Sequence, residues 1–307
     1  MSLHSFSRYQ IVPIVTKYVQ DKKGTNISRI DMLNLQNTKP ETLKKELEEL
    51  FNGLGHERIL LPSSIEVPDD TTIEFNYKNI LGCVDVGTII STDYTYGLPE
   101  KAVAYISFKL IDAIEYLAGK RIVHRSIMCP NILINKNGIV KLVGFHTAVS
   151  LNTKKHWIRK SDNINEYDPD ILKDCLNYLA PEVLKQDLVG YHCSSDIYSL
   201  GVTICTMING FTPFSDMPEL EMLYEKYCGT RPKIIDSSST VDDDDEGIFD
   251  KYKEKVLSKE IHDVVVETLD CNPETRITLK KLKQHPFFIV NGTSKEILSY
   301  DKLFNQK

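Results

Sequence analysis

A change in hydrophobic periodicity partway along this 307-residue chain is the feature that most constrains its fold. In the first 80 residues, apolar residues alternate with polar ones as in short strands, most clearly over 26–33 and 73–77. After residue 100 the spacing becomes helical: 102–117 has the pattern of a long amphipathic helix, and most of 196–290 is helical by the same criterion. A strand-rich first part and a helix-rich second part predict an α+β protein with two lobes and a cleft between them.

The boundaries of the lobes follow from the same patterns. We expect a small lobe over 1–79, a hinge with two glycines over 80–87, a helical lobe over 88–290 and a C-terminal tail over 291–307. The small lobe should also contain one helix, because four of its leucines recur at helical spacing (Leu43, Leu47, Leu50 and Leu54).

The bulk composition excludes several classes of protein. Hydrophobic residues make up 41% and charged residues 26% of the chain, which is ordinary for a soluble globular protein, and the net charge of −6 gives no general attraction to nucleic acid or to anionic membranes. The seven cysteines are dispersed without a C-x-x-C pair, which is typical of reduced thiols rather than of a disulfide framework or a zinc site. Since there is also no apolar run of about 18 residues, we expect a cytoplasmic protein, with the nucleus as a further location.

The segment His124-Arg125-Ser126, at the end of an apolar helix, resembles a kinase catalytic loop that has lost its base. In the protein-kinase pattern H-R-D-x-x-x-x-N, the Asp accepts the proton of the attacking hydroxyl and the Asn holds a magnesium ion. Here Ser126 replaces the Asp, whereas Asn131 stands at the position of the Asn. Met128 replaces the loop lysine that would neutralise phosphate charge.

A second acid is missing farther along the chain. Thirteen residues after Asn131, Gly144-Phe145-His146 stands where kinases carry Asp-Phe-Gly, whose Asp bridges the metal to the phosphates. The glycine-rich flap that covers the phosphates is also absent, because no glycine occurs between Tyr9 and Gly24. A chain with this frame but without both carboxylates is expected to bind a partner rather than to transfer phosphate, and to need no metal.

Three further landmarks follow in the order that the kinase pattern requires. Ala180-Pro181-Glu182 would close an activation segment over 144–182, and Asp196 opens a helix whose carboxylate would brace the catalytic loop. Arg276 would form a buried ion pair with Glu182, and Arg125 would brace the activation segment. Each landmark is weak alone, but together and in this order they indicate the protein-kinase fold over nearly the whole chain.

Longer matches narrow the family. The segments 122–126, 179–184, 195–199 and 212–218 resemble the STRAD adaptor pseudokinases of the sterile-20 group. That family shares the His-Arg-Ser loop, the Gly in the Asp-Phe-Gly triplet and an Arg in place of the nucleotide-binding Lys, here Arg29. The resemblance implies a catalytically inactive allosteric adaptor that holds the serine/threonine kinase liver kinase B1 in its active shape, together with the helical-repeat scaffold called mouse protein 25.

The resemblance leaves nucleotide binding open. Some STRAD-like proteins hold ATP without magnesium, and Arg29 and Asn131 are the candidate residues for contacting it in this chain. We expect Arg29 to form an ion pair with Glu46, with Glu48 as the alternative because the register near residue 53 is not fixed by the pattern. Asn131 is expected to hydrogen-bond its own loop, since a single ligand would hold magnesium poorly.

Residues 147–179 are polar and unusually long for an activation segment, and they contain Trp157, the only tryptophan, and Tyr167. Because Trp and Tyr are enriched among interface hot spots, we predict that both contact the partner kinase. The alternative, in which Trp157 packs on its own helical lobe, stays open. The scaffold is expected to contact the helix over 41–52, as the family resemblance implies.

Two other functions also remain open. A nucleotide-sensing module would change its partner affinity with ATP, and metal-independent stabilisation by ATP would reveal it. A weakly active atypical kinase would recruit a carboxylate from Asp162, Glu166 or Asp168, and phosphate transfer by the chain alone would establish it.

Overall fold

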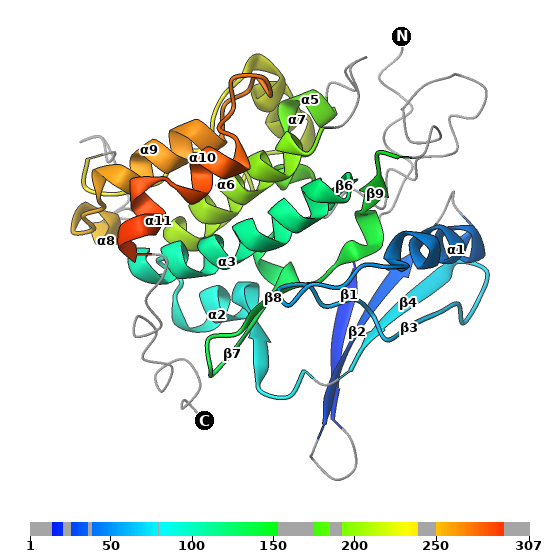
Figure 1. Ribbon diagram of the computed structural model, residues 1–307. Coiled ribbons are helices and arrows are strands. Elements are labelled where there is room, and N and C mark those ends of the chain that lie inside the picture. The colour runs from blue at the N-terminus through cyan, green and yellow to red at the C-terminus, as the bar shows by residue number, and fades with distance from the viewer. Residues whose placement is uncertain are drawn as a thin grey trace. The chain divides into compact units, whose positions relative to one another are not determined.

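The computed structural model describes residues 14–20, 26–35, 39–78, 80–152, 175–184, 192–238 and 250–291, which form two compact units (Figure 1). The first unit holds the described residues up to 52, together with 61–78, 80–81 and 175–176. The second unit holds 53–60, 82–152 and the described residues from 177 onward. The segment 53–60, which the sequence pattern assigned to the small lobe, therefore groups with the second unit.

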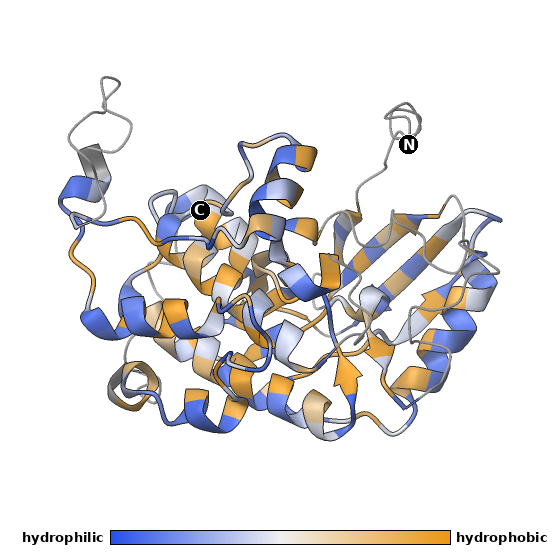
Figure 2. Cartoon of the chain, turned by 90° about the horizontal axis from the view of Figure 1, so that it is seen from above, coloured by the Kyte–Doolittle hydropathy of each residue, from blue (hydrophilic) through white to orange (hydrophobic). Residues whose placement is uncertain are grey.

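The first unit is built on a four-stranded antiparallel sheet. Its strands are hydrogen-bonded in the order β1-β2-β4-β3 and comprise β1 (Val15–Gln20), β2 (Ile27–Asn34), β3 (Ser64–Glu66) and β4 (Thr72–Tyr77). In β4 every second side chain is buried, and alternating apolar and polar bands are visible along the strands of the sheet (Figure 2). This alternation confirms the strands predicted over 26–33 and 73–77.

Helix α1 (Pro40–Phe51) completes the first unit and confirms the helix predicted from the leucine spacing. Pro40 is tolerated at its start because the first N–H groups of a helix have no intrahelical partner. Leu43 and Leu47, one turn apart, are buried, so this stripe faces the core of the unit.

The second unit begins with two small sheets. Strands β5 (Cys83–Asp85), β7 (Ile132–Asn135) and β8 (Val140–Leu142) are paired in the order β5-β7-β8, and β6 (Ile122–Val123) pairs with β9 (Val149–Ser150). The segment 80–87, expected as a hinge, contains β5 and the start of α2 (Val86–Asp93). The Asp85 carboxylate caps that helix by accepting a hydrogen bond from the Thr88 N–H at 2.8 Å.

Helices make up the rest of the second unit. They are α3 (Glu100–Gly119), α5 (Pro181–Leu184), α6 (Ser194–Asn209), α7 (Glu219–Cys228), α8 (Asp250–Lys253), α9 (Lys259–Thr268), α10 (Leu279–Lys283) and α11 (Pro286–Asn291), with 3-10 turns η1 (Cys129–Asn131), η2 (Phe145–Thr147) and η5 (Leu176–Tyr178). Helix α6 is buried along its whole length, because α3 and α9 both pack against it. A membrane-crossing segment is not found among these helices, since within the described ranges none is both long enough and apolar enough.

The segment 53–60 is held by contacts inside the second unit. The Leu142 N–H donates to the Arg58 carbonyl at 2.8 Å, and the Leu60 N–H donates to the Leu142 carbonyl at 2.9 Å, as in a one-residue strand pairing. The His56 ring stacks on Tyr116 of α3 with centroids 4.9 Å apart, and the Tyr116 hydroxyl accepts from the Gly55 N–H at 3.0 Å. These contacts explain why the segment belongs with the helices and not with the sheet it adjoins in sequence.

Candidate functional site

The catalytic-like loop runs from β6 to η1, and Asp196 in the first turn of α6 holds its start. The Asp196 carboxylate accepts hydrogen bonds from the backbone N–H groups of His124 at 2.8 Å and of Arg125 at 3.0 Å. Arg125 has a φ of +65°, a conformation that non-glycine residues rarely adopt, so the loop needs this support. Burial raises the pKa of Asp196 to about 6, although the two N–H groups act in the opposite direction. The bracing role predicted for Asp196 is present in the structure.

His124 is fully buried and its ring is fixed by two backbone groups. Its Nδ1 accepts from the Ser126 N–H at 3.2 Å, so the proton lies on Nε2, which donates to the Val143 carbonyl at 3.1 Å. The ring also meets the edge of Phe145, with centroids 4.4 Å apart. Burial first, and the nearby His146 second, lower the pKa of His124 to about 3, so the imidazole is neutral at physiological pH.

Arg125 ties the loop to the beginning of the activation segment. Its Nε donates to the Thr147 carbonyl, and the Thr147 hydroxyl donates back to the His124 carbonyl at 2.8 Å. Both residues are buried. The structure therefore places Arg125 in the bracing position that the sequence predicted.

Asn131 closes the loop on itself. Its Nδ2 donates to the Ser126 carbonyl at 2.9 Å and to the Ser126 hydroxyl at 2.8 Å. Gly144, with a φ of +81°, lies against the same side chain: a Cβ added there would be 2.4–2.5 Å from the Asn131 carboxamide atoms. A residue with a side chain at position 144 would therefore force the Asn131 side chain to shift.

These residues do not fit a magnesium ion. Magnesium sites in phosphoryl-transfer proteins use carboxylate oxygens in a strict octahedron, whereas this loop offers the Ser126 hydroxyl, the Asn131 amide oxygen and a glycine. The Asn131 amide is turned so that its nitrogen donates to Ser126, and an amide nitrogen that donates hydrogen bonds does not bind a cation. Met128, at the position of the loop lysine, is buried and brings no charge.

Arg29 lies in β2 and is buried, and its predicted partner requires correction. Its Nε donates to Asp31 at 2.7 Å, and the Thr16 hydroxyl donates to the same carboxylate oxygen at 2.7 Å. Glu46 and Glu48 are exposed on α1, and the ion pair within the described ranges joins Arg29 to Asp31 instead. Arg29 and Asp31 are two residues apart on one strand and therefore point to the same face of the sheet.

Glu182 and Arg276 form the ion pair predicted from the landmarks. Two guanidinium nitrogens donate to the two carboxylate oxygens at 2.7 and 2.9 Å, and the side chains of Arg276 and Glu182 are 0% and 7% exposed. The guanidinium also donates to the carbonyls of Ser194 and Asp270, each at 2.8 Å, and lies over the Tyr198 ring at 5.2 Å. The end of the activation segment is thus fixed to the helices by a buried charge pair in which every guanidinium nitrogen donates a hydrogen bond.

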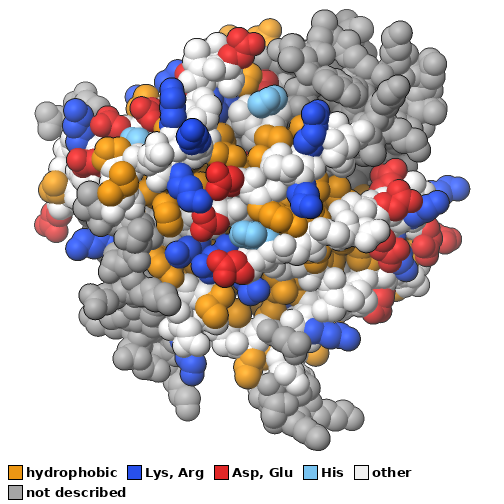
Figure 3. All heavy atoms as spheres, viewed as in Figure 1, with side chains coloured by type: hydrophobic (Ala, Val, Ile, Leu, Met, Phe, Trp, Pro, Cys, Tyr) orange, Lys and Arg blue, Asp and Glu red, His pale blue; other side chains and the backbone are white. Residues whose placement is uncertain are grey.

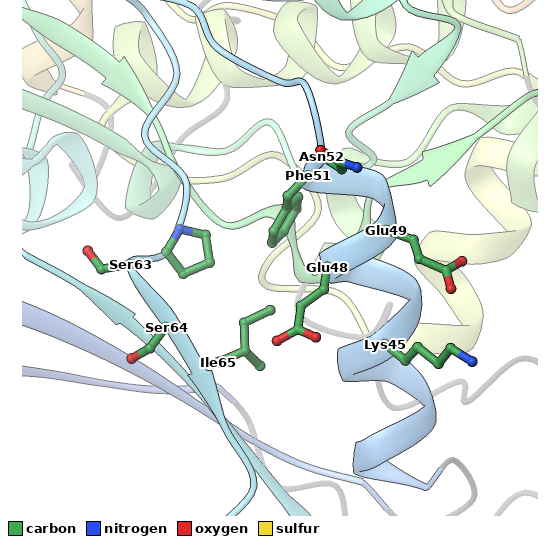
Figure 4. A pocket seen from close by; sticks show the side chains of 9 residues that line it. Lys45, Glu48, Glu49, Phe51, Asn52, Ser63, Ser64 and Ile65 are labelled. Carbon is green, nitrogen blue, oxygen red and sulfur yellow. The ribbon is translucent and has the colours of Figure 1, made fainter.

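A shallow groove of about 540 Å³ lies within the first unit, between α1 and β3 (Figure 4). Figure 4 shows Phe51 and Glu48 on its helix side and Ile65 on its strand side. The groove borders the helix expected to contact a scaffold. The predicted partner contacts Trp157 and Tyr167 lie outside the described residues.

Two contributors to this site were missed at the level of sequence. Thr147 returns a hydrogen bond to the loop, and Asp31 neutralises Arg29. The second had a readable signal, because a charge pair at i and i+2 in a strand shares one face. Thr147 had none, since its contact depends on how the chain turns after Gly144.

Comparison with known proteins agrees with this geometry. The model of the family described as "Protein kinase domain" matches residues 15–288. The worm (Caenorhabditis elegans) protein named STE20-related kinase adapter protein strd-1 is 36% identical over 72% of this chain and 58% of its own length, so the chain spans less than two thirds of that relative. The mouse (Mus musculus) STE20-related kinase adapter protein alpha is 28% identical over 91% of this chain and 72% of its own length.

A plant protein named as a kinase matches as well, so similarity to this fold does not by itself indicate the adapter role. Mitogen-activated protein kinase kinase kinase 9 of Arabidopsis thaliana is 30% identical over 78% of this chain and 26% of its own length. The shared frame is therefore common to relatives named as kinases and as adapters. The chain belongs to the protein kinase domain family and is similar over most of its length to the STE20-related kinase adapter proteins.

Proposed function

We propose that this chain is a catalytically inactive adaptor that binds a serine/threonine kinase of the liver kinase B1 type and stabilises its active conformation, in a complex with a scaffold of the mouse protein 25 type. The observation that carries the proposal is the closed loop, in which Asn131 bonds to Ser126 and fills the space beside Gly144. Relatives named kinase adapter proteins support the same role.

The loop argues against phosphoryl transfer. That reaction relies almost entirely on positioning and on charge that stabilises the transferring group, chiefly metal ions held by carboxylates. Ser126 and Gly144 supply no carboxylate and Met128 supplies no cation. Loss of these groups together is expected to cost several orders of magnitude in rate.

The hydrogen-bonded surroundings of the loop argue for binding. Asp196, Arg125 and the Glu182–Arg276 pair hold the loop and the end of the activation segment through buried hydrogen bonds. An adaptor needs such a fixed surface, because it acts by binding the active state of its partner better than the inactive state. A preference of about 1.4 kcal/mol shifts that balance tenfold, so a modest interface suffices.

Two surfaces follow from the proposal. The activation segment would meet the kinase as a substrate does, with Trp157 and Tyr167 as anchors, and α1 with its adjoining groove would meet the scaffold. ATP is not required by this mechanism; if it binds, it does so without magnesium, because the loop does not fit the metal.

Reconstitution tests the proposal. Mixing the purified chain with liver kinase B1 and the scaffold should give a ternary complex by gel filtration and raise the activity of the kinase toward a peptide. The double variant Trp157→Ala, Tyr167→Ala should weaken kinase binding, while Val256→Ala at an 82% exposed site should not. Absence of both complex and activation would contradict the adaptor role.

A second measurement addresses catalysis by the chain alone. We expect no metal-dependent ATP turnover, and little even after Ser126→Asp with Gly144→Asp, because the added side chain collides with Asn131 and the glycine flap is missing. Robust turnover by the wild type that Asn131→Ala abolishes would establish an atypical kinase instead. Thermal stabilisation by ATP in the presence of a chelator, with partner affinity dependent on ATP, would favour nucleotide sensing.

A further inference from the structure

Strand β2 carries a buried cation and a buried carboxylate on one face of the sheet. Arg29 and Asp31 are both 2% exposed, and the Arg29 Nε donates to Asp31 Oδ1 at 2.7 Å. On the face of the molecule shown in Figure 3, by contrast, charged side chains of both signs lie at the surface, where solvent and salt screen them. A charged pair that is withdrawn from solvent calls for an explanation of its own, because charged residues are rarely buried unless they are paired.

The neighbouring strands fix the position of this pair. Thr16 of β1 lies directly opposite Asp31, and its hydroxyl donates to Asp31 Oδ1 at 2.7 Å. Tyr18 of β1 and Tyr77 of β4 lie directly opposite Arg29, one on each side. Since opposite residues of antiparallel strands point to the same face of a sheet, the pair lies among side chains from three adjacent strands.

Arg29 stays charged in these surroundings. Burial acts to lower its pKa, but the charge of Asp31 and the hydrogen bond to it outweigh burial and raise the pKa above its ordinary value. A buried cation needs a compensating charge, because removing one partner of a buried ion pair leaves the other uncompensated. A negatively charged oxygen beside Arg29 is therefore a condition for a stable sheet.

Two kinds of group can supply this negative charge. The donors of a guanidinium bind carboxylate and phosphate oxygens alike, so an acidic side chain and a bound phosphate are interchangeable in this role. In this sheet the side chain holds the position, since the Arg29 Nε is bonded to Asp31 and Thr16 binds the same oxygen. A dissolved anion would have to displace Asp31 to reach this nitrogen, because almost none of Arg29 is open to solvent.

We infer that Asp31 is a built-in counter-ion that takes the place of a bound anion at Arg29, so that the sheet of the first unit is stable without phosphate or nucleotide. Arg29 then contributes nothing to any affinity of the chain for ATP. The inference goes beyond the adaptor role and does not rest on it, because it concerns contacts among β1, β2 and β4 alone.

A chemical-rescue experiment tests the inference. Asp31→Ala leaves Arg29 without its counter-ion and vacates the space of one carboxylate, so the unfolding temperature of the full chain should fall by about 5–10 °C. Formate, the smallest carboxylate, is the probe. The variant should unfold about 2 °C or more higher in sodium formate than in sodium chloride of the same concentration, because a ligand that binds the folded state stabilises it. The wild type should unfold at nearly the same temperature in both salts.

Glu74→Ala is the matched control. Glu74 belongs to the same sheet but lies opposite Met32, on the face away from Arg29. Its substitution also removes one carboxylate, and it should show no gain from formate. Absence of a formate gain in a folded Asp31→Ala variant, or an equal gain in Glu74→Ala, would overturn the inference.

A second comparison keeps the test decisive if Asp31→Ala does not fold. Arg29→Met with Asp31→Leu removes both charges together, and replacing a buried ion pair by apolar residues of similar size is often tolerated. The affinity of this double variant for ATP in the presence of a chelator, measured by isothermal titration calorimetry, should match that of the wild type within about twofold. A loss of about tenfold or more would show that Arg29 holds the phosphates and that the inference is wrong. No partner protein enters these measurements, so their failure is distinguishable from failure of the adaptor proposal.

Discussion

Two neighbouring parts of the second unit differ in whether they carry charged side chains. The bracing contacts retain their charges: Asp196 accepts two backbone N–H groups, and Arg276 forms a two-point pair with Glu182. Ser126, at the position of the base, and Gly144, at the position of a metal ligand, carry no charge, and Asn131 forms a neutral hydrogen bond with Ser126. Charges that hold the backbone are costly to remove, whereas charges used for chemistry repel one another and contribute little to folding. The bracing contacts can therefore hold the kinase fold without charged side chains at positions 126 and 144.

The largest effect is expected when the bracing ion pair between Glu182 and Arg276 is broken. Arg276→Ala leaves the Glu182 carboxylate buried without its cation and should lower the free energy of unfolding by about 3–5 kcal/mol. Urea denaturation of the purified chain measures this. Arg231→Ala is the matched control, because the Arg231–Asp270 pair is longer, at 3.4 Å, and partly exposed. It should cost less than about 1 kcal/mol. Similar losses in the two variants would contradict the bracing role.

A somewhat smaller effect is expected at Asp196. Asp196→Ala leaves the buried N–H groups of His124 and Arg125 without an acceptor and should cost about 2–4 kcal/mol. Asp196→Asn keeps one acceptor oxygen and should cost roughly half as much. Asp112→Ala, which removes a partly exposed partner of Lys283, serves as the surface control in the same denaturation series. Equal stability of the Ala and Asn variants would mean that the two hydrogen bonds do not hold the loop.

The sequence predicted these braces because each lies in a motif with a fixed order and a fixed chemical role. Asp196, Glu182 and Arg276 could be assigned without knowing the path of the chain between them. The strands over 26–33 and 73–77 were equally predictable, because apolar and polar residues alternate along them as buried and exposed positions do in a strand.

Other features depended on geometry that no local pattern records. The partner of Arg29 was predicted wrongly: Glu46 or Glu48 on the helix was preferred over Asp31, two positions along the same strand. Strand β5 was hidden in a glycine-containing connector, since it is only three residues long and is defined by its pairing with β7. The contact between Asn131 and Gly144 arises from a turn with a positive φ at Gly144. Glycine permits this conformation, but its presence in the sequence does not predict it.

A substitution at Gly144 tests the uncharged part of the site, where Asn131 lies against this residue. Gly144→Ala introduces a Cβ within 2.4–2.5 Å of Asn131 and should cost about 2–3 kcal/mol, part of it from the left-handed backbone. Gly53→Ala is the matched control, because its φ of +77° is similar but its added Cβ meets nothing within 4 Å. It should cost about 1–2 kcal/mol.

A double-mutant cycle isolates the collision itself. Asn131→Ala removes the obstructing side chain, so Gly144→Ala should cost about 1 kcal/mol less in that background than in the wild type. Additive losses in the cycle would show that the Asn131 side chain does not occupy the space beside position 144.

The smallest expected effect is a pH dependence of the unfolding free energy that arises from His124. This residue contacts both the bracing Asp196 and the uncharged Ser126. In the folded chain burial holds its pKa near 3, whereas in the unfolded chain it returns to 6.5. Below pH 6.5 the unfolded chain therefore binds a proton that the folded chain cannot, and stability falls as the pH is lowered through this window. Between pH 7.5 and 6 the loss of stability should be about 1 kcal/mol.

Asp196 acts in the opposite sense, because its raised pKa of about 6 lets the folded chain bind a proton at a higher pH than the unfolded chain does. His124→Phe removes only the contribution of the imidazole, so its unfolding free energy should fall by this much less than that of the wild type between pH 7.5 and 6. Parallel curves for the two proteins would mean that the imidazole is not held neutral in the folded chain.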